Sequence, residues 1–471
     1  ALIAPGVVLN NDGSFQRPLR FRGPDLDSYT EHELMATRAR LNNVLRRFGS
    51  HWCLHVEAAR RRALGYPESA FPNRVAKTID RERRAAFTSQ GAHFESEFHL
   101  TLAYLPPSEG ARRLSGMFVE GEEEGKDVSY RAHLEHFQGQ VKQVANLLAG
   151  FMPEVHLLDD GETLTYLHGC VSGRRINLAV PDVPFYLDEM LTDQPLTGGL
   201  SPKLGSNCLK TLSIRAYVNR TLPCLLDRLN ELALEYRWVG RYLPLDKADA
   251  LGRLNKLRRH WFAKRKGLWI LLKEAITRQE SRLEDSDSIN KAEDVDAALQ
   301  EVGSDFCSFG DFTLTVTVWD EDAGTAADKA RAVQQVVDSV GLVSQVEDFN
   351  ALSAWFGSLP GHAYANVRRP LISSLNVCDL VPLSAVWSGP TRNKHLDSPP
   401  LLITRTKGST PFRLSLHQGD VGHTIVAGPT GAGKSPLLNL LACQWLRYPN
   451  ACVYIFDKGG SCRAMTLAMG G

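Results

Sequence analysis

The segment that most constrains the fold is Gly428–Ser435, which reads GPTGAGKS. It matches the pattern GxxxxGK[ST] at every position, and this pattern is typical of a loop that holds phosphate groups. Gly431 and Gly433 allow backbone dihedrals that other residues avoid, so successive N–H groups can converge on phosphate oxygens. Such a loop joins a strand to the start of a helix, whose dipole favours negative charge. The motif therefore predicts an α/β layer in this region of the chain.

Each residue of the motif is a candidate contact to nucleotide, and two have a specific expected role. Lys434 is expected to reach the β- and γ-phosphates of ATP, and the Ser435 hydroxyl is expected to bind Mg²⁺. Pro436 follows directly, which is tolerated because the first helical turn makes no intrahelical use of that N–H. The predicted cofactors are ATP and Mg. The predicted nucleotide-binding residues are Gly428, Pro429, Thr430, Gly431, Ala432, Gly433, Lys434 and Ser435.

The residues on both sides of the loop predict the rest of this layer. Residues 422–428 (GHTIVAG) are expected to form a buried strand, and residues 451–457 (ACVYIFD) a second one, with a shorter strand at 412–417. A helix is expected between the two longer strands. Its apolar residues are spaced for burial on one face: Leu437, Leu438, Leu441 and Trp445. This order of elements is the start of a parallel α/β sheet.

Asp457, at the end of the second expected strand, leaves two interpretations open. It could take part in the chemistry of the nucleotide site, or it could cap the following turn. The turn is favoured because Lys458, rather than a second acid, comes next. Hydrolysis needs a carboxylate that orients water and usually a cation that neutralises developing charge. Neither can be assigned between Pro436 and Gly471, so the catalytic residues are expected beyond Gly471.

The remaining residues predict α+β modules. The polar, proline-bearing segment 388–400 marks a boundary, and the predicted domains are 1–172, 173–390 and 391–471. Thr30 and Glu33 predict a capping box at the start of the first helix. Strands are expected at 17–26, 52–59, 93–107, 210–218 and 312–322, and helices at 30–48, 134–151, 222–236, 247–284 and 327–341.

Overall composition indicates neither a nucleic-acid binder nor a membrane protein. The 54 basic and 53 acidic residues leave a formal charge of +1, and the apolar run 267–272 is far shorter than the roughly 20 residues that span a bilayer. Nine cysteines without a CxxC pair argue against a disulfide framework or a zinc ribbon. Because the chain begins with Ala1 rather than Met, we expect a short leader to be missing, and the N-terminus predicts nothing about targeting.

Histidines and a basic cluster are the alternative candidates for a site. His51 and His55 have HxxxH spacing but lie in an expected strand, which separates the rings too far for a shared metal. His133 and His136 lack a third ligand nearby. The cluster 256–267 favours a solvated helix face over a nucleic-acid or lipid contact, because acidic residues follow it. His93 and His99 are expected on the exposed, polar face of their strand.

Four stretches together resemble the TrbE-type conjugal-transfer ATPases of type IV secretion systems, in the CagE/TrbE/VirB family. They are 6–28, 93–107, 422–438 and 455–471. The resemblance runs along essentially the whole chain. The phosphate loop itself is generic, but the flanking segments and their order are more distinctive.

This resemblance implies an N-terminal region, a middle CagE/TrbE/VirB-type domain and, from residue 391, the beginning of a RecA-like motor. It also implies assembly, usually as a hexamer, on the cytoplasmic face of the bacterial inner membrane. The implied partners are inner-membrane components of the secretion system and a pilin or other secretion substrate, and nucleic acid is not indicated. The implied activity is an ATPase that energises pilus assembly and substrate transfer. The family's second acidic motif and arginine finger would lie beyond Gly471.

Two other functions remain open from the sequence. A DNA-pumping ATPase of the coupling type would be expected to show membrane spans or a strongly basic channel lining, and neither is visible here. A structural scaffold would use nucleotide binding only to fix contacts between subunits. The roughly 400 residues before the loop fit docking surfaces and keep that second function open.

Overall fold

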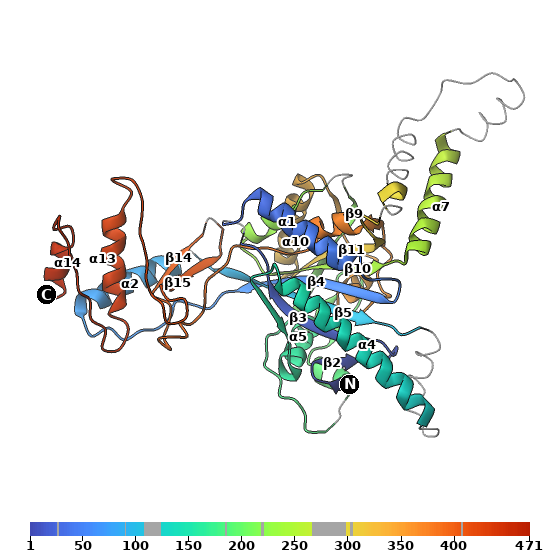
Figure 1. Ribbon diagram of the computed structural model, residues 1–471, viewed down its shortest axis with the longest axis horizontal. Helices are drawn as coiled ribbons and strands as arrows, with labels where there is room; N and C mark the ends of the chain where they lie inside the picture. The colour runs from blue at the N-terminus through green and yellow to red at the C-terminus, as the bar shows by residue number, and fades with distance from the viewer. Residues whose placement is uncertain are drawn as a thin grey trace, which may run out of the picture. The chain divides into compact units, whose positions relative to one another are not determined.

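The computed structural model describes residues 1–25, 28–89, 91–107, 124–183, 186–217, 221–265, 298–301, 305–406 and 408–471 (Figure 1). The chain forms two compact units, each assembled from three separate stretches. Unit 1 comprises Ala1–Ala59, Glu97–Leu229 and Tyr236–Ser384, and unit 2 comprises Arg60–Ser96, Asn230–Glu235 and Ala385–Gly471. The predicted boundaries near 172 and 390 stay predictions. Within the described residues, every helix is too short or too polar to cross a membrane.

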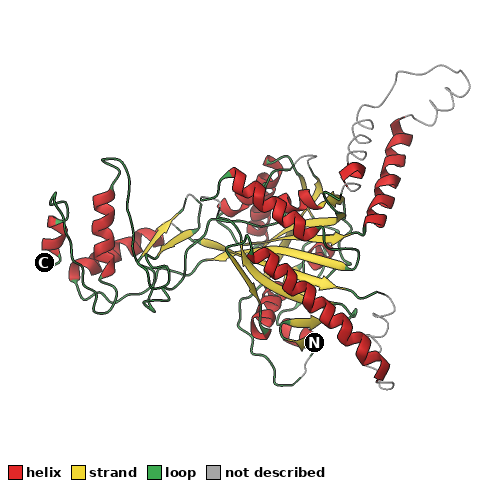
Figure 2. Cartoon of the chain, in the orientation of Figure 1, coloured by secondary structure: helices red, strands yellow, loops and turns green. Residues whose placement is uncertain are grey.

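A 13-stranded sheet dominates unit 1, drawn in yellow in Figure 2. All of its pairings with a resolved register are antiparallel, as between β10 and β11, where Arg237 lies opposite Thr317. The neighbouring strands run in the order β1 (Leu2–Ala4), β2 (Val7–Leu9), β3 (Phe15–Arg22), β5 (Phe94–Tyr104), β4 (Trp52–Arg62), β10 (Tyr236–Pro244), β11 (Phe309–Asp320), β9 (Asn207–Ala216), β8 (Lys203–Leu204) and β7 (Leu196–Thr197). Three further strands pair with β3, β9 and β11 respectively: β6 (Glu154–Leu157), β12 (Val343–Val346) and β13 (Leu371–Ser373).

Helices cover both faces of the central strands. On one face, Leu54, Leu100 and Tyr242 share a small apolar cavity with side chains from α1 (Glu31–Leu45), α4 (Glu124–Ala149) and α12 (Ser374–Leu380). On the other face, α5 (Asp160–Ser172) and the end of α11 (Ala351–Gly357) lie over β4, β5 and β10. The other described helices of this unit are α6 (Leu187–Leu191), α7 (Lys247–Arg265) and α10 (Ala323–Ser339).

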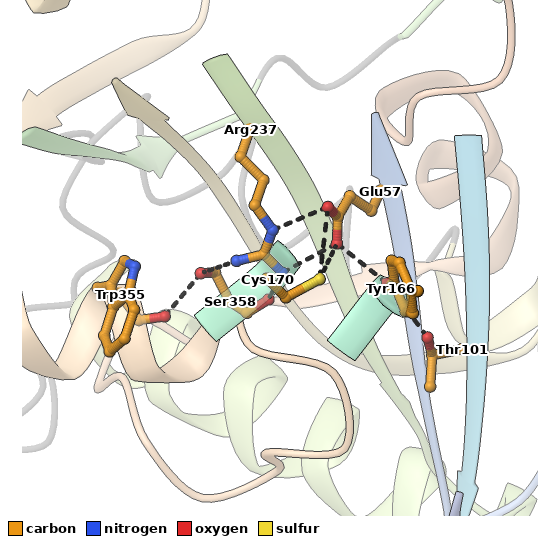
Figure 3. A network of polar contacts seen from close by, with 7 residues as sticks. All are labelled: Glu57, Thr101, Tyr166, Cys170, Arg237, Trp355 and Ser358. Carbon is orange, nitrogen blue, oxygen red and sulfur yellow. Dashed lines mark hydrogen bonds and ion pairs between the residues drawn. The ribbon is translucent and has the colours of Figure 1, made fainter. Parts of the chain in front are cut away.

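A buried ion pair joins β4 to β10 at the centre of this sheet (Figure 3). The Arg237 guanidinium donates to both Glu57 carboxylate oxygens, at 2.8 and 2.9 Å, and also to the carbonyl oxygen of Ser358 at 2.7 Å. The Tyr166 hydroxyl donates to Glu57 at 3.0 Å. Burial alone would raise the pKa of Glu57, but the Arg237 charge and these hydrogen bonds hold it below its ordinary value. The pair therefore links strands that are distant in sequence.

Most predicted elements of unit 1 are confirmed. The helix at 30–48 is α1, and its capping box is present, with Thr30 N–H donating to Glu33 at 2.8 Å and Glu33 N–H donating back at 3.3 Å. The helices predicted at 134–151 and 327–341 are α4 and α10. The five predicted strands are β3, β4, β5, β9 and β11.

The helix predicted at 222–236 is wrong. A 3₁₀ turn, Asp227–Glu231, occupies part of this region, and strand β10 begins at Tyr236. The pairing of β10 between β4 and β11 outweighs the helical spacing of the leucines before it, because tertiary contacts override local preference. The helix predicted at 247–284 begins as α7, and its residues from 266 onward lie outside the described residues, as does most of the basic cluster 256–267.

The expected exposure of two histidines is also wrong. His99 is buried and stacks on Tyr166 of α5, with ring centroids 4.2 Å apart. His93 is buried and stacks on Phe87 at 3.8 Å. Alternation along a strand identifies a polar face, but here helices cover that face as well.

Unit 2 combines a helix from the first hundred residues with the C-terminal segment of the chain. It contains α2 (Arg74–Ser89), the antiparallel hairpin β14 (Leu402–Arg405) and β15 (Pro411–Leu414), α13 (Lys434–Trp445) and α14 (Arg463–Ala468). Leu401, Leu402, Leu441 and Tyr448 form its apolar cluster, which packs α13 on the hairpin. Helices α2 and α13 are in contact.

The two longer strands predicted around the loop are not present in this structure. Residues 422–428 and 451–457 form no strand, and Ile425 and Phe456 are 94% and 100% exposed. A strand of a parallel sheet needs a hydrogen-bonded neighbour on at least one side. Within the described residues neither segment has such a neighbour, so the described residues of unit 2 do not contain a RecA-like sheet. The chain as described is a mixed α/β protein with a large antiparallel sheet.

Candidate nucleotide-binding site

The glycine-rich loop Gly428–Ser435 leads directly into α13. Gly433 is the N-cap residue of that helix and has φ 85° and ψ 16°, and Gly431 has φ 83°. A Cβ at either position would meet no atom within 4 Å. The requirement for glycine is therefore conformational rather than a matter of space, because L side chains rarely adopt positive φ. This confirms the unusual dihedrals expected of the two glycines.

Lys434 lies back across the loop that precedes it. Its Nζ donates to the carbonyl oxygens of Gly428, at 2.8 Å, and Pro429, at 2.6 Å. These contacts hold the ammonium group beside the loop backbone at the N-terminus of α13. A phosphate group would offer charged acceptors in place of neutral carbonyls, and charge-assisted hydrogen bonds are roughly twice as strong as neutral ones. The position of Lys434 thus suits an anion at the loop.

Ser435 is half-buried in the first turn of α13. Mg²⁺ usually takes one or two protein ligands, with phosphate oxygens and water completing its shell, so a single hydroxyl beside a phosphate loop fits this ion. Within the described residues no group of three or more His, Cys, Asp or Glu side chains is placed to hold a metal. A magnesium site in this region would therefore depend on Ser435, the phosphates and water. Pro436 follows within the first helical turn, as expected.

Asp457 accepts hydrogen bonds from its own turn. Its carboxylate accepts from the N–H groups of Cys462, at 2.8 Å, and Gly459, at 3.0 Å, and from the Ser461 hydroxyl at 3.0 Å. The hydrogen bond from Cys462 is the main cause that lowers the pKa of Asp457. Of the two interpretations left open by the sequence, the structure supports the turn cap.

The expected apolar face of α13 is buried at one end only. Leu441 is buried, and the Trp445 ring stacks on His417 at 5.9 Å. In contrast, Leu437 and Leu438 are 38% and 48% exposed. The end of α13 that lies away from the loop is therefore the end that packs against the rest of unit 2.

Sequence reasoning missed two residues that hold this far end. Arg447, just beyond α13, forms a buried ion pair with Asp80 of α2 at 2.9 Å. The two residues are 367 positions apart, and neither lies in a recognisable motif. The one local signal was an aspartate on the otherwise basic and apolar helix around it, which indicates a buried partner only weakly.

Two family models match segments of this chain. Residues 6–112 match the model described as type IV secretion system ATPase VirB4/TrbE, N-terminal domain. Residues 271–368 match the model of the CagE, TrbE, VirB family, a component of the type IV transporter system. Across its whole length the chain is 34% identical to a conjugal transfer protein TrbE of Rhizobium radiobacter. This chain belongs to the VirB4/TrbE family.

Other relatives extend the same comparison. A probable conjugal transfer protein TrbE of Sinorhizobium fredii is 36% identical over 66% of the chain, which corresponds to 46% of that protein. A type IV secretion system protein virB4 of Bartonella quintana is 22% identical over 99% of the chain. The chain spans 59% of the Rhizobium protein and 58% of the Bartonella protein. The loop at Gly428–Ser435 lies outside both family models but within the whole-length match to TrbE.

Proposed function

We propose that this VirB4/TrbE family member binds ATP and magnesium at Gly428–Ser435. In the full-length protein, hydrolysis of that ATP energises pilus assembly and substrate transfer in a type IV secretion system. The observation that carries this proposal is the loop backbone. Two glycines with positive φ lead into α13, and the Lys434 ammonium lies beside the loop carbonyls.

In this proposal the residues of the loop divide the work of binding. Backbone N–H groups between Pro429 and Ser435 donate to phosphate oxygens, and the N-terminus of α13 adds a favourable dipole. Lys434 exchanges its carbonyl partners for β- and γ-phosphate oxygens. The Ser435 hydroxyl holds magnesium, which supplies charge neutralisation when bound. The loop binds and orients the triphosphate.

We assign the hydrolytic residues to positions beyond Gly471. Asp457 is the only acidic residue after Ser435, and its oxygens accept three hydrogen bonds from its own turn. The curated relatives are longer than this chain, which leaves room for further motifs in proteins of this family. The missing carboxylate and cation are thus proposed in the region of the full-length protein that matches the rest of those relatives.

Residues 391–471 are proposed to begin a RecA-like P-loop domain. Support comes from the apolar side chains exposed around the loop, including Leu437 and Leu438 on α13, Ile425 before it and Phe456 after it. Apolar surface of this extent favours burial against further chain. The proposed full-length protein works as a hexamer on the cytoplasmic face of the inner membrane. Its proposed partners are inner-membrane components of the secretion system and a pilin or other secretion substrate.

The test is Lys434→Ala in the full-length protein. We expect ATP turnover and substrate transfer to be lost, because the charge that reaches the phosphates is gone, while assembly with the secretion system is kept. Turnover is measured as phosphate release and transfer as conjugation frequency. Lys458→Ala is the matched control, since it removes an exposed lysine of the same unit outside the loop. Normal transfer by Lys434→Ala would refute the motor and favour a structural scaffold.

A further inference from the structure

Arg447 is the centre of a buried polar cluster at the far end of α13. Its side chain is almost fully buried, and each terminal nitrogen has a partner. Nη1 donates to the carbonyl oxygen of Pro400 at 2.5 Å, and Nη2 donates to Asp80 at 2.9 Å and to the Gln444 side chain at 2.7 Å. The guanidinium also lies over the Phe71 ring, 5.6 Å from its centroid. A buried guanidinium with this many partners is held in one orientation.

Asp80 brings α2 into this cluster. The carboxylate is buried in the middle of α2, and the oxygen that accepts from Arg447 also accepts from the Tyr66 hydroxyl at 2.7 Å. A buried aspartate without its arginine would be an uncompensated charge, so the two side chains require each other. The pair therefore fixes α2, which lies between β4 and β5 in sequence, to the helix that follows the glycine-rich loop.

The geometry of α13 makes its far end important for the loop. Twelve residues form a rigid rod of about 18 Å, with Lys434 at one end and Arg447 just beyond the other. Near the loop, Leu437 and Leu438 are largely exposed and give the helix little support. Contacts at Leu441, Trp445 and Arg447 therefore set the direction in which the first N–H groups of α13 point.

We propose that Asp80 and Arg447 are positioning residues for nucleotide binding. The proposal rests on the ATP site proposed above and extends it to a residue pair that touches no nucleotide. By holding the far end of α13 against α2, the pair sets the orientation of the loop N–H groups and of Lys434. Because binding linkage is reciprocal, nucleotide in the loop in turn stabilises the contact between α2 and α13.

The test compares two buried pairs of unit 2 in the full-length protein. Asp80→Asn removes the charge that holds Arg447, and Arg447→Lys keeps the charge but loses the planar fork. The matched control is Glu95→Gln, because Glu95 forms a bidentate pair with Arg413, at 2.8 and 3.2 Å, that joins β5 to β15 rather than to α13. The probe is a fluorescent ATP analogue with magnesium, titrated against folded protein quantified by circular dichroism and thermal unfolding.

We expect Asp80→Asn to weaken nucleotide affinity about tenfold, a typical size for coupling through a packed element. Arg447→Lys should weaken it less, and Asp80→Glu, which keeps the charge, should restore some of the loss. Glu95→Gln should lower the unfolding temperature without changing affinity. Hydrogen exchange should show that nucleotide protects α2 amides in the wild type and not in Asp80→Asn.

Three results would overturn the proposal. Unchanged affinity in Asp80→Asn, with a wild type that binds, removes the positioning role and leaves the ATP site standing. An equal loss in Glu95→Gln shows that general destabilisation explains the effect. A wild type that fails to bind the analogue refutes the ATP site and the positioning role together.

Discussion

Unit 1 and unit 2 use the same chemical device in different surroundings. In unit 1, the buried pair Glu57–Arg237 lies between two central strands whose faces are both covered by helices (Figure 3). In unit 2, the buried pair Asp80–Arg447 joins two helices, one of which carries the exposed glycine-rich loop. The first pair lies within a continuous core. The second lies at the end of a helix whose other end is open to solvent and available for ligand.

This difference teaches where each unit places its stability. Unit 1 buries apolar and polar side chains on both sides of a long sheet, so its free energy of unfolding depends on many simultaneous contacts. Unit 2 has only a two-stranded hairpin and a small apolar cluster among its described residues, and it exposes apolar residues around the loop. Binding elements are commonly drawn from the less stable regions of a protein. We expect unit 1 to respond to substitutions through stability and unit 2 through binding.

The largest effect on this comparison should come from Glu57→Gln. Arg237 would remain buried without a carboxylate, and breaking a buried pair in this way costs about 3–5 kcal/mol of unfolding free energy. Hydrogen exchange of the β4 and β10 amides measures the loss within unit 1, where a single global transition does not apply. Glu154→Gln is the control, because its contacts with Arg20 and Arg22 are exposed and are worth at most about 1 kcal/mol. A loss below the control value would show that the pair is not a stabilising centre.

A second prediction concerns the pH dependence of unit 1. Burial raises the pKa of Asp227 to about 6, and the carboxylate accepts from the Ser384 hydroxyl, with Cys224, Asp379 and Arg38 also around this region of the fold. The folded state therefore binds more protons than the unfolded state between pH ~4 and ~6. The contribution of Asp227 to stability is fully present below pH ~4 and falls as pH rises to ~6, by about 3 kcal/mol in total.

Asp227→Asn isolates this contribution, because the amide resembles the protonated acid and does not titrate. The variant should match the wild type near pH 4 and exceed its unfolding free energy above pH 6. Denaturant titrations of both chains across this range give the difference at each pH. Asp328→Asn, at an exposed position of α10, should show no such divergence. A constant difference between Asp227→Asn and wild type at all pH values would contradict the raised pKa.

The smallest effect on stability, but a clear one on binding, is expected from Gly433→Ala. A Cβ at φ 85° costs about 1–2 kcal/mol, and relief of that strain would turn the loop N–H groups away from phosphate. Gly419→Ala is the control, since Gly419 also has positive φ and open space in unit 2 but lies outside the loop. Both variants should lose similar stability, and only Gly433→Ala should lose affinity for the fluorescent ATP analogue. Equal affinities would show that the loop does not need this backbone conformation.

Local signals in the sequence were sufficient for much of unit 1. The Thr30–Glu33 capping box predicts the start of α1, and strict alternation predicts β5 and β11, because these patterns depend on residues only a few positions apart. The glycine-rich loop and its helix were predictable for the same reason. Strand β10 was not, since the leucines before it have helical spacing and its partners β4 and β11 are remote in sequence.

The sequence by itself determined the loop chemistry, the helix that follows it and the alternation of the main strands, since a few neighbouring residues specify each. Only the tertiary structure decided that residues 60–96 belong to the unit of the loop, that helices cover His99, and that Arg447 meets Asp80. The reason is physical. A buried charge or a covered strand face is stable only beside its partner, and that partner is found by folding rather than by spacing along the chain.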